Sequence, residues 1–271
     1  MYTELHCHSN YSFQEGASSV EELLVRAKEL GYRALALTDH DNLCGAMHFA
    51  EVAQSLDLQA ITGAEVTLKD GSHLTLLAET RQGYRNLCNL LSYSYITGGR
   101  QNPGLDPRYL PELAEGLILL TGCRKGPISG LLTKGQQREA EETLRQYLDW
   151  FGAANVFVEL QQNLVQGDTQ RNRRLIDLAR GLGVGVAATN NVHYHIPERH
   201  RLQDALVAIS HNRSLENTHP QRRPSGQFYL KSPEEMAGLF RGCPEAIENT
   251  LRIAGRCAFD LTRDLAYQFP D

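Results

Sequence analysis

The sequence predicts an α/β protein with a largely parallel sheet. Seven short apolar runs occur in the first 200 residues, and most are followed by a segment with helical periodicity. Of the 271 residues, 41% are hydrophobic and 22% are charged, which is ordinary for a globular protein with a substantial core. An open doubly wound sheet and a closed barrel both fit this pattern.

The expected strands and helices alternate along the chain. Ser18 and Ser19 each precede a glutamate by three residues, which indicates a helix start, and Gly31 suits the end of that helix. After Glu198 the pattern becomes mainly helical, with an irregular polar loop over residues 212–227. The expected strands lie within residues 3–8, 33–38, 58–68, 73–79, 116–123, 155–161 and 183–189. The expected helices lie within residues 18–31, 42–56, 83–95, 136–151 and 169–182, with a loop over residues 99–111.

Composition and charge exclude several classes of protein. The net charge of −5 argues against a strong general nucleic-acid binder, and the basic runs at 170–174 and 221–224 are typical of solvated helix faces or loops. No apolar run reaches the roughly 18 residues of a membrane span, and no secretory signal is visible. The six cysteines form no CxxC pair. We therefore expect a cytoplasmic protein without membrane contacts.

Polar side chains gather where the expected strands end. His6 and His8 end the first strand. Because residues i and i+2 of a strand share a face, we expect both imidazoles to point to one spot. Cys7 should point to the opposite face and pack in the core. A lone pair of this kind also arises by chance on a solvated face. The TDHD run at 38–41 is more informative, because crowded carboxylates are costly unless they are paired or bound to metal. The other metal-capable residues near strand ends are Glu65, His73, Cys123, Asn191 and His193.

The carboxyl ends of parallel strands meet at one face, where α/β proteins bind ligands. His73 opens its strand, so it reaches this face only if the strand is antiparallel or lies at an edge. Imidazole, carboxylate and a single thiolate suit Zn²⁺ first, and also Mn²⁺ or Fe²⁺. The supply of ligands predicts two or three divalent ions with Glu65 as a bridge. Adjacent metals that polarise a phosphoryl oxygen and acidify a bound water indicate phosphoester hydrolysis.

Six segments carry a resemblance to a known family. In order, HCHSNYSF, ALTDHDNLCG, GAEV, HLTLLA, LTGC and ATNNVHY resemble the PHP (polymerase and histidinol phosphatase) domain. The likeness covers nearly the whole chain and is strongest to the PHP domain at the start of bacterial C-family DNA polymerases (DNA polymerase III alpha subunit-like), especially their error-prone branch. It implies a distorted, TIM-like seven-stranded (β/α)7 barrel over residues 1–200 and a mainly helical extension over residues 201–271.

The resemblance also implies a trinuclear metal centre with assigned ligands. Glu65 would bridge two of the metals. Asn191 and Glu15 depart from the family pattern, which usually has Asp at the first position and Asp or His at the second. An uncharged Asn ligand should weaken the first metal. The implied ligands are His6, His8, Glu65 and Asn191 for the first metal, Glu65, His73 and Cys123 for the second, and Glu15, His40 and His193 for the third.

Three functions follow from these observations. The first is a metal-dependent phosphoesterase, acting as a 3′–5′ proofreading exonuclease or on a small phosphomonoester. The second is a catalytically weakened module whose metals only brace a polymerase, as the Asn191 departure suggests. The third is a free-standing phosphatase of the histidinol-phosphate type, against which Cys123 and Glu15 argue. The predicted catalytic residues of the first function are His6, His8, Glu65 and Asn191, with Arg124 or Lys125 offsetting phosphoryl charge.

The chain ends at LAYQFPD, where the family polymerases continue into further domains. We therefore expect this chain to be the PHP domain of an error-prone polymerase whose polymerase activity resides in a missing C-terminal region. Its expected partners are a DNA 3′ end reached through the full-length polymerase, the remaining polymerase domains, and other mutagenesis or replication proteins.

Overall fold

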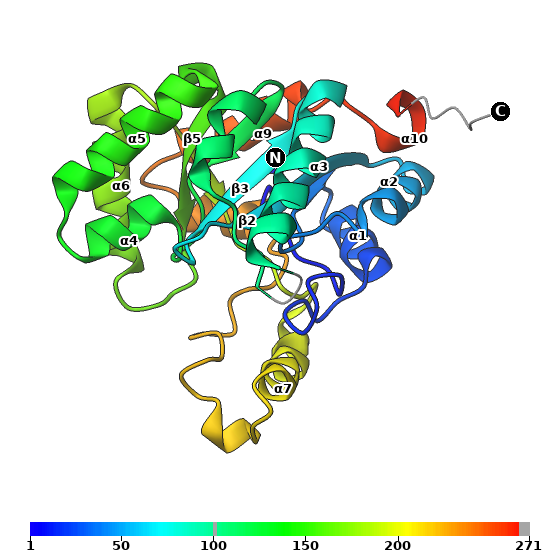
Figure 1. Ribbon diagram of the computed structural model, residues 1–271. Coiled ribbons are helices and arrows are strands. Elements are labelled where there is room, and N and C mark those ends of the chain that lie inside the picture. The colour runs from blue at the N-terminus through cyan, green and yellow to red at the C-terminus, as the bar shows by residue number, and fades with distance from the viewer. Residues whose placement is uncertain (100–101, 266–271) are drawn as a thin grey trace.

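Six strands form one sheet in the order β1-β2-β3-β4-β5-β6 in the computed structural model, which describes residues 1–99 and 102–265 (Figure 1). The sheet curls into a half-barrel, and helices cover it, so the predicted α/β class is confirmed. The strands are β1 (Ala34–Leu37), β2 (Gln59–Thr67), β3 (His73–Ala78), β4 (Leu117–Leu120), β5 (Val156–Gln161) and β6 (Gly185–Thr189).

The helices follow the sequence pattern, with one addition. Ser19 and Glu22 form the predicted capping box, with Ser19 Oγ accepting from Glu22 N at 3.3 Å and Glu22 Oε2 accepting from Ser19 N at 2.9 Å. The short helix α4 had no periodic signal. The helices are α1 (Val20–Glu29), α2 (Ala46–Ser55), α3 (Arg81–Gly98), α4 (Pro127–Thr133), α5 (Gln137–Phe151), α6 (Asp168–Leu182), α7 (His200–Ser210), α8 (Pro233–Leu239), α9 (Glu245–Arg256) and α10 (Leu261–Asp264).

Short 3-10 turns occupy the connecting segments. The expected loop over 99–111 holds two of them, and residues 100 and 101 within it lie outside the described residues. In the terminal LAYQFPD run only Leu265 is described. The turns are η1 (Pro107–Tyr109), η2 (Pro111–Leu113), η3 (Ala153–Asn155), η4 (Pro197–Arg199) and η5 (Leu215–Asn217).

The segment predicted as the first strand, residues 3–8, is extended but is not a regular strand. Glu4 makes an isolated parallel bridge to Leu35 of β1, and Cys7 makes one to Val192, just after β6. Two of its amides bond side chains, with His6 N donating to Glu4 Oε1 at 3.0 Å and Cys7 N to a threonine Oγ1 at 2.9 Å, whereas His8 N donates to Val192 O at 2.8 Å. The expectation of seven strands is thus corrected to six, with this segment lying between the two ends of the sheet.

The direction of β3 decides where His73 lies. Both neighbours of β3 run antiparallel to it, whereas the other adjacent strands of the sheet run parallel. Thr67 at the end of β2 pairs with His73, and Leu120 at the end of β4 pairs with Thr75. His73 therefore starts its strand at the edge where β2 and β4 end. This antiparallel direction is the condition under which the sequence predicts that His73 reaches the site.

Apolar side chains are buried on both faces of the sheet. One face packs against α1, α2, α3, α5 and α6 in the larger core. On the other face, Ile253 and Ala254 of α9 pack with alternate strand residues such as Ile61 and Leu120. Asn249 Nδ2 also donates to Val186 O of β6 at 2.8 Å. The division of the chain near residue 200 stays a prediction, and α9 from beyond that point contributes directly to the core.

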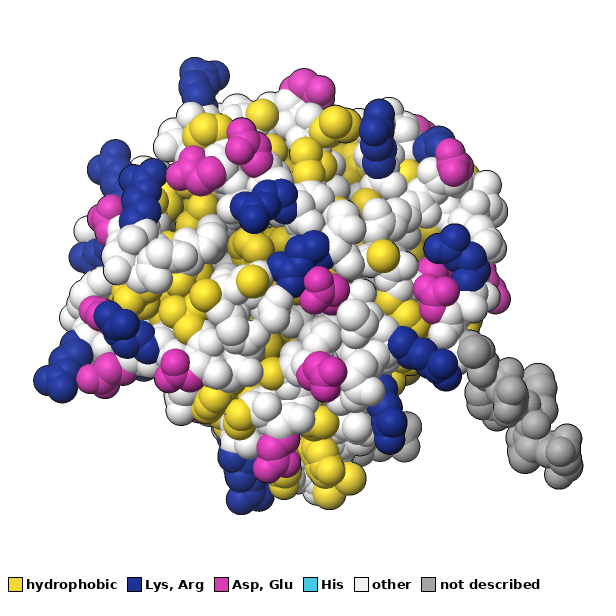
Figure 2. Space-filling model, turned by 90° about the horizontal axis from the view of Figure 1, so that it is seen from above, with side chains coloured by type: hydrophobic (Ala, Val, Ile, Leu, Met, Phe, Trp, Pro, Cys, Tyr) yellow, Lys and Arg dark blue, Asp and Glu magenta, His cyan; other side chains and the backbone are white. Residues whose placement is uncertain are grey.

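The surface differs from one side of the molecule to another. The segment with α7 extends away from the sheet in Figure 1. The face seen in Figure 2 mixes basic and acidic side chains, and no histidine is visible on it. Among the helices of residues 1–99 and 102–265, not one combines the length and the apolar composition that a membrane crossing requires.

Candidate metal centre

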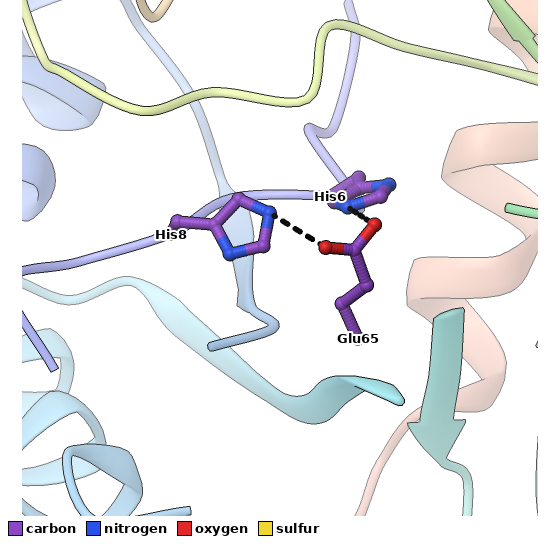
Figure 3. Close-up of side chains that lie close together, drawn as sticks. All are labelled: His6, His8 and Glu65. Carbon is purple, nitrogen blue, oxygen red and sulfur yellow. Dashed lines mark ion pairs between the residues drawn. The ribbon is translucent and has the colours of Figure 1, made fainter. Parts of the chain in front are cut away.

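Glu65 lies at the centre of a cluster of four histidines, of which Figure 3 shows His6 and His8. Its Oε1 is 3.3 Å from His6 Nε2 and 3.3 Å from His73 Nδ1. Its Oε2 is 3.7 Å from His8 Nε2 and 3.0 Å from His40 Nδ1. Two groups of candidate metal ligands therefore share this carboxylate, one with His6 and His8 and one with His40 and His73. The second group differs from the assignment that the resemblance implied, which placed His40 at the third metal and Cys123 beside His73. Glu65 is thus common to both groups, and its role as a bridge between two metals stays a prediction.

Backbone pairing brings these side chains together from distant parts of the chain. Val192 lies beside the first segment, since its N donates to His6 O at 2.9 Å and its O accepts from His8 N at 2.8 Å. His40 follows β1 and makes an isolated parallel bridge to Glu65, which lies within β2 rather than after it. Cys7 points away from the cluster and is fully buried in the larger core, as predicted.

Hydrogen bonds fix which ring nitrogens of His6 and His8 are free. His6 Nδ1 lies 2.6 Å from Glu159 Oε1, so this nitrogen carries the proton and donates it. Ser12 Oγ donates its proton to Asp39 Oδ1 at 2.7 Å and is therefore an acceptor for His8 Nδ1 at 3.1 Å. When either ring is neutral, its Nε2 therefore presents a lone pair toward Glu65. Carboxylate-oriented imidazoles of this kind are typical of metal ligands.

The charges of the cluster favour a bound cation. Burial lowers the pKa of His6, but the carboxylates of Glu159 and Glu65 outweigh it and raise this pKa to about 10. Burial would raise the pKa of Glu65, yet the surrounding histidines hold it well below its usual range. Mainly through burial, the pKa values of His8 and His193 fall well below the usual range, which leaves both imidazoles in the neutral, metal-binding form. A proton on His6 or a bound metal ion can neutralise the excess negative charge of these carboxylates.

The donor atoms themselves fit a divalent metal. Two ligand atoms on a tetrahedral Zn²⁺ with bonds of about 2.0–2.1 Å lie about 3.4 Å apart, close to the separations around Glu65. Buried polar atoms ordinarily have hydrogen-bond partners, and six atoms here have none among the described residues. These atoms are Nε2 of His6, His8 and His193, Nδ1 of His73, Oε1 of Glu65 and Oδ1 of Asn191.

The remaining predicted ligands surround this cluster at differing distances. The ring of His193 stacks on that of His8, with centroids 4.4 Å apart. Glu15 Oε2 lies 3.9 Å from His40 Nδ1. Cys123 is buried, its Sγ accepts from Lys125 N at 3.4 Å, and burial raises the pKa of its thiol well above the usual range. Neither Glu15 nor Cys123 belongs to the two compact ligand groups found among the described residues.

A basic side chain that the sequence did not single out approaches the cluster. Arg223 Nη2 lies 3.6 Å from Glu15 Oε2 and 3.4 Å from His193 Nδ1. The predicted Arg124 instead forms an ion pair with Asp168 at 3.2 Å. Both arginines line a cavity of about 540 Å³ that also reaches Cys123 and Asn191. Arg223 lies in the basic run at 221–224, whose sequence is typical of a solvated loop. No local pattern assigns it to the site.

Glu159 is a second residue that sequence reasoning missed, and here a signal was available. It is a fully buried carboxylate in the middle of β5, within the otherwise apolar run VFVEL. Besides His6 Nδ1 it accepts from Thr189 Oγ1 at 2.5 Å and Gln161 Nε2 at 2.7 Å. An acidic residue inside a buried strand requires partners, which indicates a polar site beneath it.

Comparison with known proteins places these residues in a family context. The family described as PHP domain matches residues 4–163. DNA polymerase III subunit alpha of Treponema pallidum is 41% identical over 270 residues, which covers 94% of this chain and 23% of that protein. Error-prone DNA polymerase of Mycobacterium tuberculosis is 42% identical over 272 residues, which covers 96% of this chain and 25% of that protein.

This chain thus spans about a quarter of the length of these curated relatives. Among solved structures, an amidohydrolase from Chromobacterium violaceum has a TM-score of 0.46 and 16% identity, covering 71% of this chain and 88% of that chain.

Proposed function

This chain belongs to the PHP domain family, and from that premise we propose that it is a metal-dependent phosphoesterase of an error-prone DNA polymerase III alpha-type enzyme. One observation carries the proposal. Four imidazoles converge on a single buried carboxylate, and the facing nitrogens of His6, His8 and His73 lack hydrogen-bond partners among the described residues. The proposed substrate is a DNA 3′ end, and the proposed activity is a 3′–5′ exonuclease. Polymerase activity would belong to other domains of the longer protein.

We assign the residues to holding and orienting roles. His6, His8, His40, His73 and Glu65 would hold two divalent ions, Zn²⁺ first and Mn²⁺ or Fe²⁺ as alternatives, and His193 with Glu15 would hold a third. Asn191 and Cys123 complete the proposed ligand set. When bound, the ions would polarise a phosphoryl oxygen and acidify a water.

The protein side chains supply orientation and charge. Glu159 and Ser12 hold the Nδ1 protons of His6 and His8, which keeps each Nε2 turned toward Glu65, where the proposed metals would bind. Arg223 is placed to offset charge on the phosphoryl oxygens, and Arg124, on the same cavity, stays part of the proposal.

Replacing both His6 and His8 by alanine is expected to lower phosphoesterase activity at least about 100-fold, because the first metal loses two ligands. The measurement is cleavage of single-stranded DNA and of p-nitrophenyl phosphate by metal-loaded protein. The matched control replaces the partly exposed His48 and the exposed His219, both outside the cluster, and should keep wild-type activity. If wild type cleaves neither substrate faster than the double variant, the proposed activity is wrong.

A second candidate function is a module whose metals only brace the protein, and Asn191 is the observation that favours it. Its Oδ1 is buried without a partner among the described residues, but an amide oxygen adds no charge to a metal. We therefore expect Asn191→Asp to tighten binding of the first metal by about tenfold and to raise cleavage, since ligand charge sets affinity. Isothermal titration with Zn²⁺ or Mn²⁺ measures the change.

Asn212→Asp is the matched control, because Asn212 shares the left-handed backbone of Asn191, with φ 49° at both positions, yet lies exposed. Equal metal affinity in the Asn191→Asp and wild-type proteins would show that this position does not contribute a ligand.

The wider setting is also a proposal. We propose that residues 3–8 take the place of a seventh strand in a closed barrel, and that residues 201–271 lead toward the remaining polymerase domains. DNA, those domains and other mutagenesis or replication proteins are the proposed partners, in the cytoplasm.

A further inference from the structure

A second cavity, of about 670 Å³, reaches the histidine cluster from the side of His40 and His73. Aromatic side chains of Tyr11, Phe13 and Tyr95 line it. We propose that this cavity binds the base of the nucleotide whose phosphate lies at the cluster, and that Phe13 stacks on that base. The inference rests on the proposed phosphoesterase function and adds a subsite that positions its substrate.

The exposure of Phe13 is the first argument. At 81% it is the most exposed large hydrophobic side chain among the described residues. An exposed phenyl ring leaves apolar surface in water, and nothing in the described part of the chain covers it. Scattered exposed hydrophobic residues are ordinary, but this one lies at the rim of a cavity that also contains candidate metal ligands.

The loop that carries Phe13 is firmly held, so its exposure is not a consequence of a loose segment. Asp39 accepts from Ser9 N at 2.7 Å, Ser9 Oγ at 2.8 Å and Ser12 Oγ at 2.7 Å. At the end of the loop, a Cβ on Gly16 would lie 1.8 Å from Ser9 O, so only glycine permits this close backbone contact. The same aspartate orients Ser12 toward His8, which couples the position of Phe13 to the cluster.

The ring of Tyr11 is fixed in a similar way. A Cβ on Gly45 would lie 2.6 Å from Tyr11 Cδ2, so the tyrosine packs directly on that backbone. Asn42 Nδ2 donates to Tyr11 O at 3.0 Å. The protein thus presents two aromatic side chains from one rigid loop at the mouth of the cavity. Preorganised rings of this kind bind without a large ordering cost.

The chemistry of the cavity matches a nucleobase better than an apolar group. Its lining includes the polar side chains of Asp41, Asn42 and Thr67, which bond within the protein and hold the wall of the cavity in place, so recognition of a base would rest on its π-face. Every base also has a π-face, so an aromatic platform recognises bases with little sequence preference. The other cavity, which reaches the cluster near Asn191, is lined by Arg222 and Arg223 and suits phosphates. The cavity lined by Phe13 would therefore bind the base, and the cavity lined by Arg223 would bind phosphate groups.

The test compares single-stranded oligonucleotides whose last residue either carries a base or is abasic. A phosphorothioate at the last linkage prevents cleavage, and Kd is measured by fluorescence anisotropy with Mn²⁺. We expect Phe13→Ala to weaken binding of the base-bearing oligonucleotide by about tenfold and of the abasic one by less than about twofold. Phe13→Trp should restore binding. Leu164→Ala, at an exposed position that does not line the cavity, should leave both unchanged.

A 2-aminopurine at the 3′ end gives a second readout, because stacking on Phe13 should quench its fluorescence in wild type and not in Phe13→Ala. Equal loss of affinity for both oligonucleotides, or no loss for either, would overturn the subsite. Failure of wild-type protein to bind either one would overturn it as well. If wild type favours the base-bearing end but cleaves no DNA, the proposed function fails and the subsite stands. If cleavage occurs but Phe13→Ala changes neither affinity, the function stands and the subsite fails.

Discussion

Replacing Glu65 by glutamine is expected to strip the protein of bound metal, with at least about a 100-fold loss of affinity. Both compact ligand groups use this carboxylate, so one isosteric change removes a charged ligand from each of them. The change in volume is negligible, which separates the loss of charge from a packing defect. Elemental analysis of protein purified without added metal, together with Zn²⁺ titration, measures the result.

Variants of two other carboxylates serve as comparisons for the Glu65→Gln result. Glu159→Gln leaves both ligand groups intact but weakens the acceptor of His6 Nδ1, so we expect an intermediate loss of about 10- to 100-fold. Glu29→Gln alters an exposed residue of α1 and should change nothing. Circular dichroism of each variant checks that it is folded. A folded Glu65→Gln protein that keeps its full metal content would contradict the bridging role.

Chelation of the bound metal is expected to lower Tm by roughly 8–16 °C. A ligand present at about 1,000 times its Kd stabilises the folded state by about 4 kcal/mol, and each kcal/mol shifts Tm by about 2–4 °C in a protein of this size. The physical origin is local, because metal removal leaves buried atoms of His6, His8, His73 and Glu65 without a hydrogen-bond partner. Differential scanning calorimetry before and after chelation measures the shift.

The His6→Ala, His8→Ala double variant is the control for chelation, since it should show a much smaller shift from its own starting Tm. This experiment is independent of catalysis. A stabilising metal without cleavage of any phosphoester would favour the bracing module over the phosphoesterase. An unchanged Tm in wild type would count against both, because either function requires metal in the folded protein.

Much of the site could be predicted from the sequence because its ligands follow strands that are easy to recognise. The apolar runs before His40 and Asn191 mark β1 and β6, and parallel neighbours bring their ends to one edge. Spacing alone placed His6 and His8 on a common face. The capping box of α1 could also be predicted, because its two residues lie only three positions apart in the sequence.

The remaining features depend on contacts that no local pattern encodes. The antiparallel direction of β3, which decides the place of His73, is set by its pairing with β2 and β4. The composition of the first segment predicts a strand, yet the amide protons of His6 and Cys7 go to side-chain acceptors. Arg223 comes from an irregular loop that packs beside the cluster, so its role depends entirely on tertiary structure.

The pairing of the first segment with the chain after β6 has a consequence for the order of folding. Asn190 N donates to Glu4 Oε2 across 186 positions of sequence, and Val192 pairs with Cys7 beside it. During synthesis, His6 and His8 leave the ribosome long before the residues that complete their surroundings. Contacts of such long range form late, because closing the chain over that distance costs entropy before any contact forms. Metal capture should therefore be one of the last events in maturation, occurring after the half-barrel has joined its two ends.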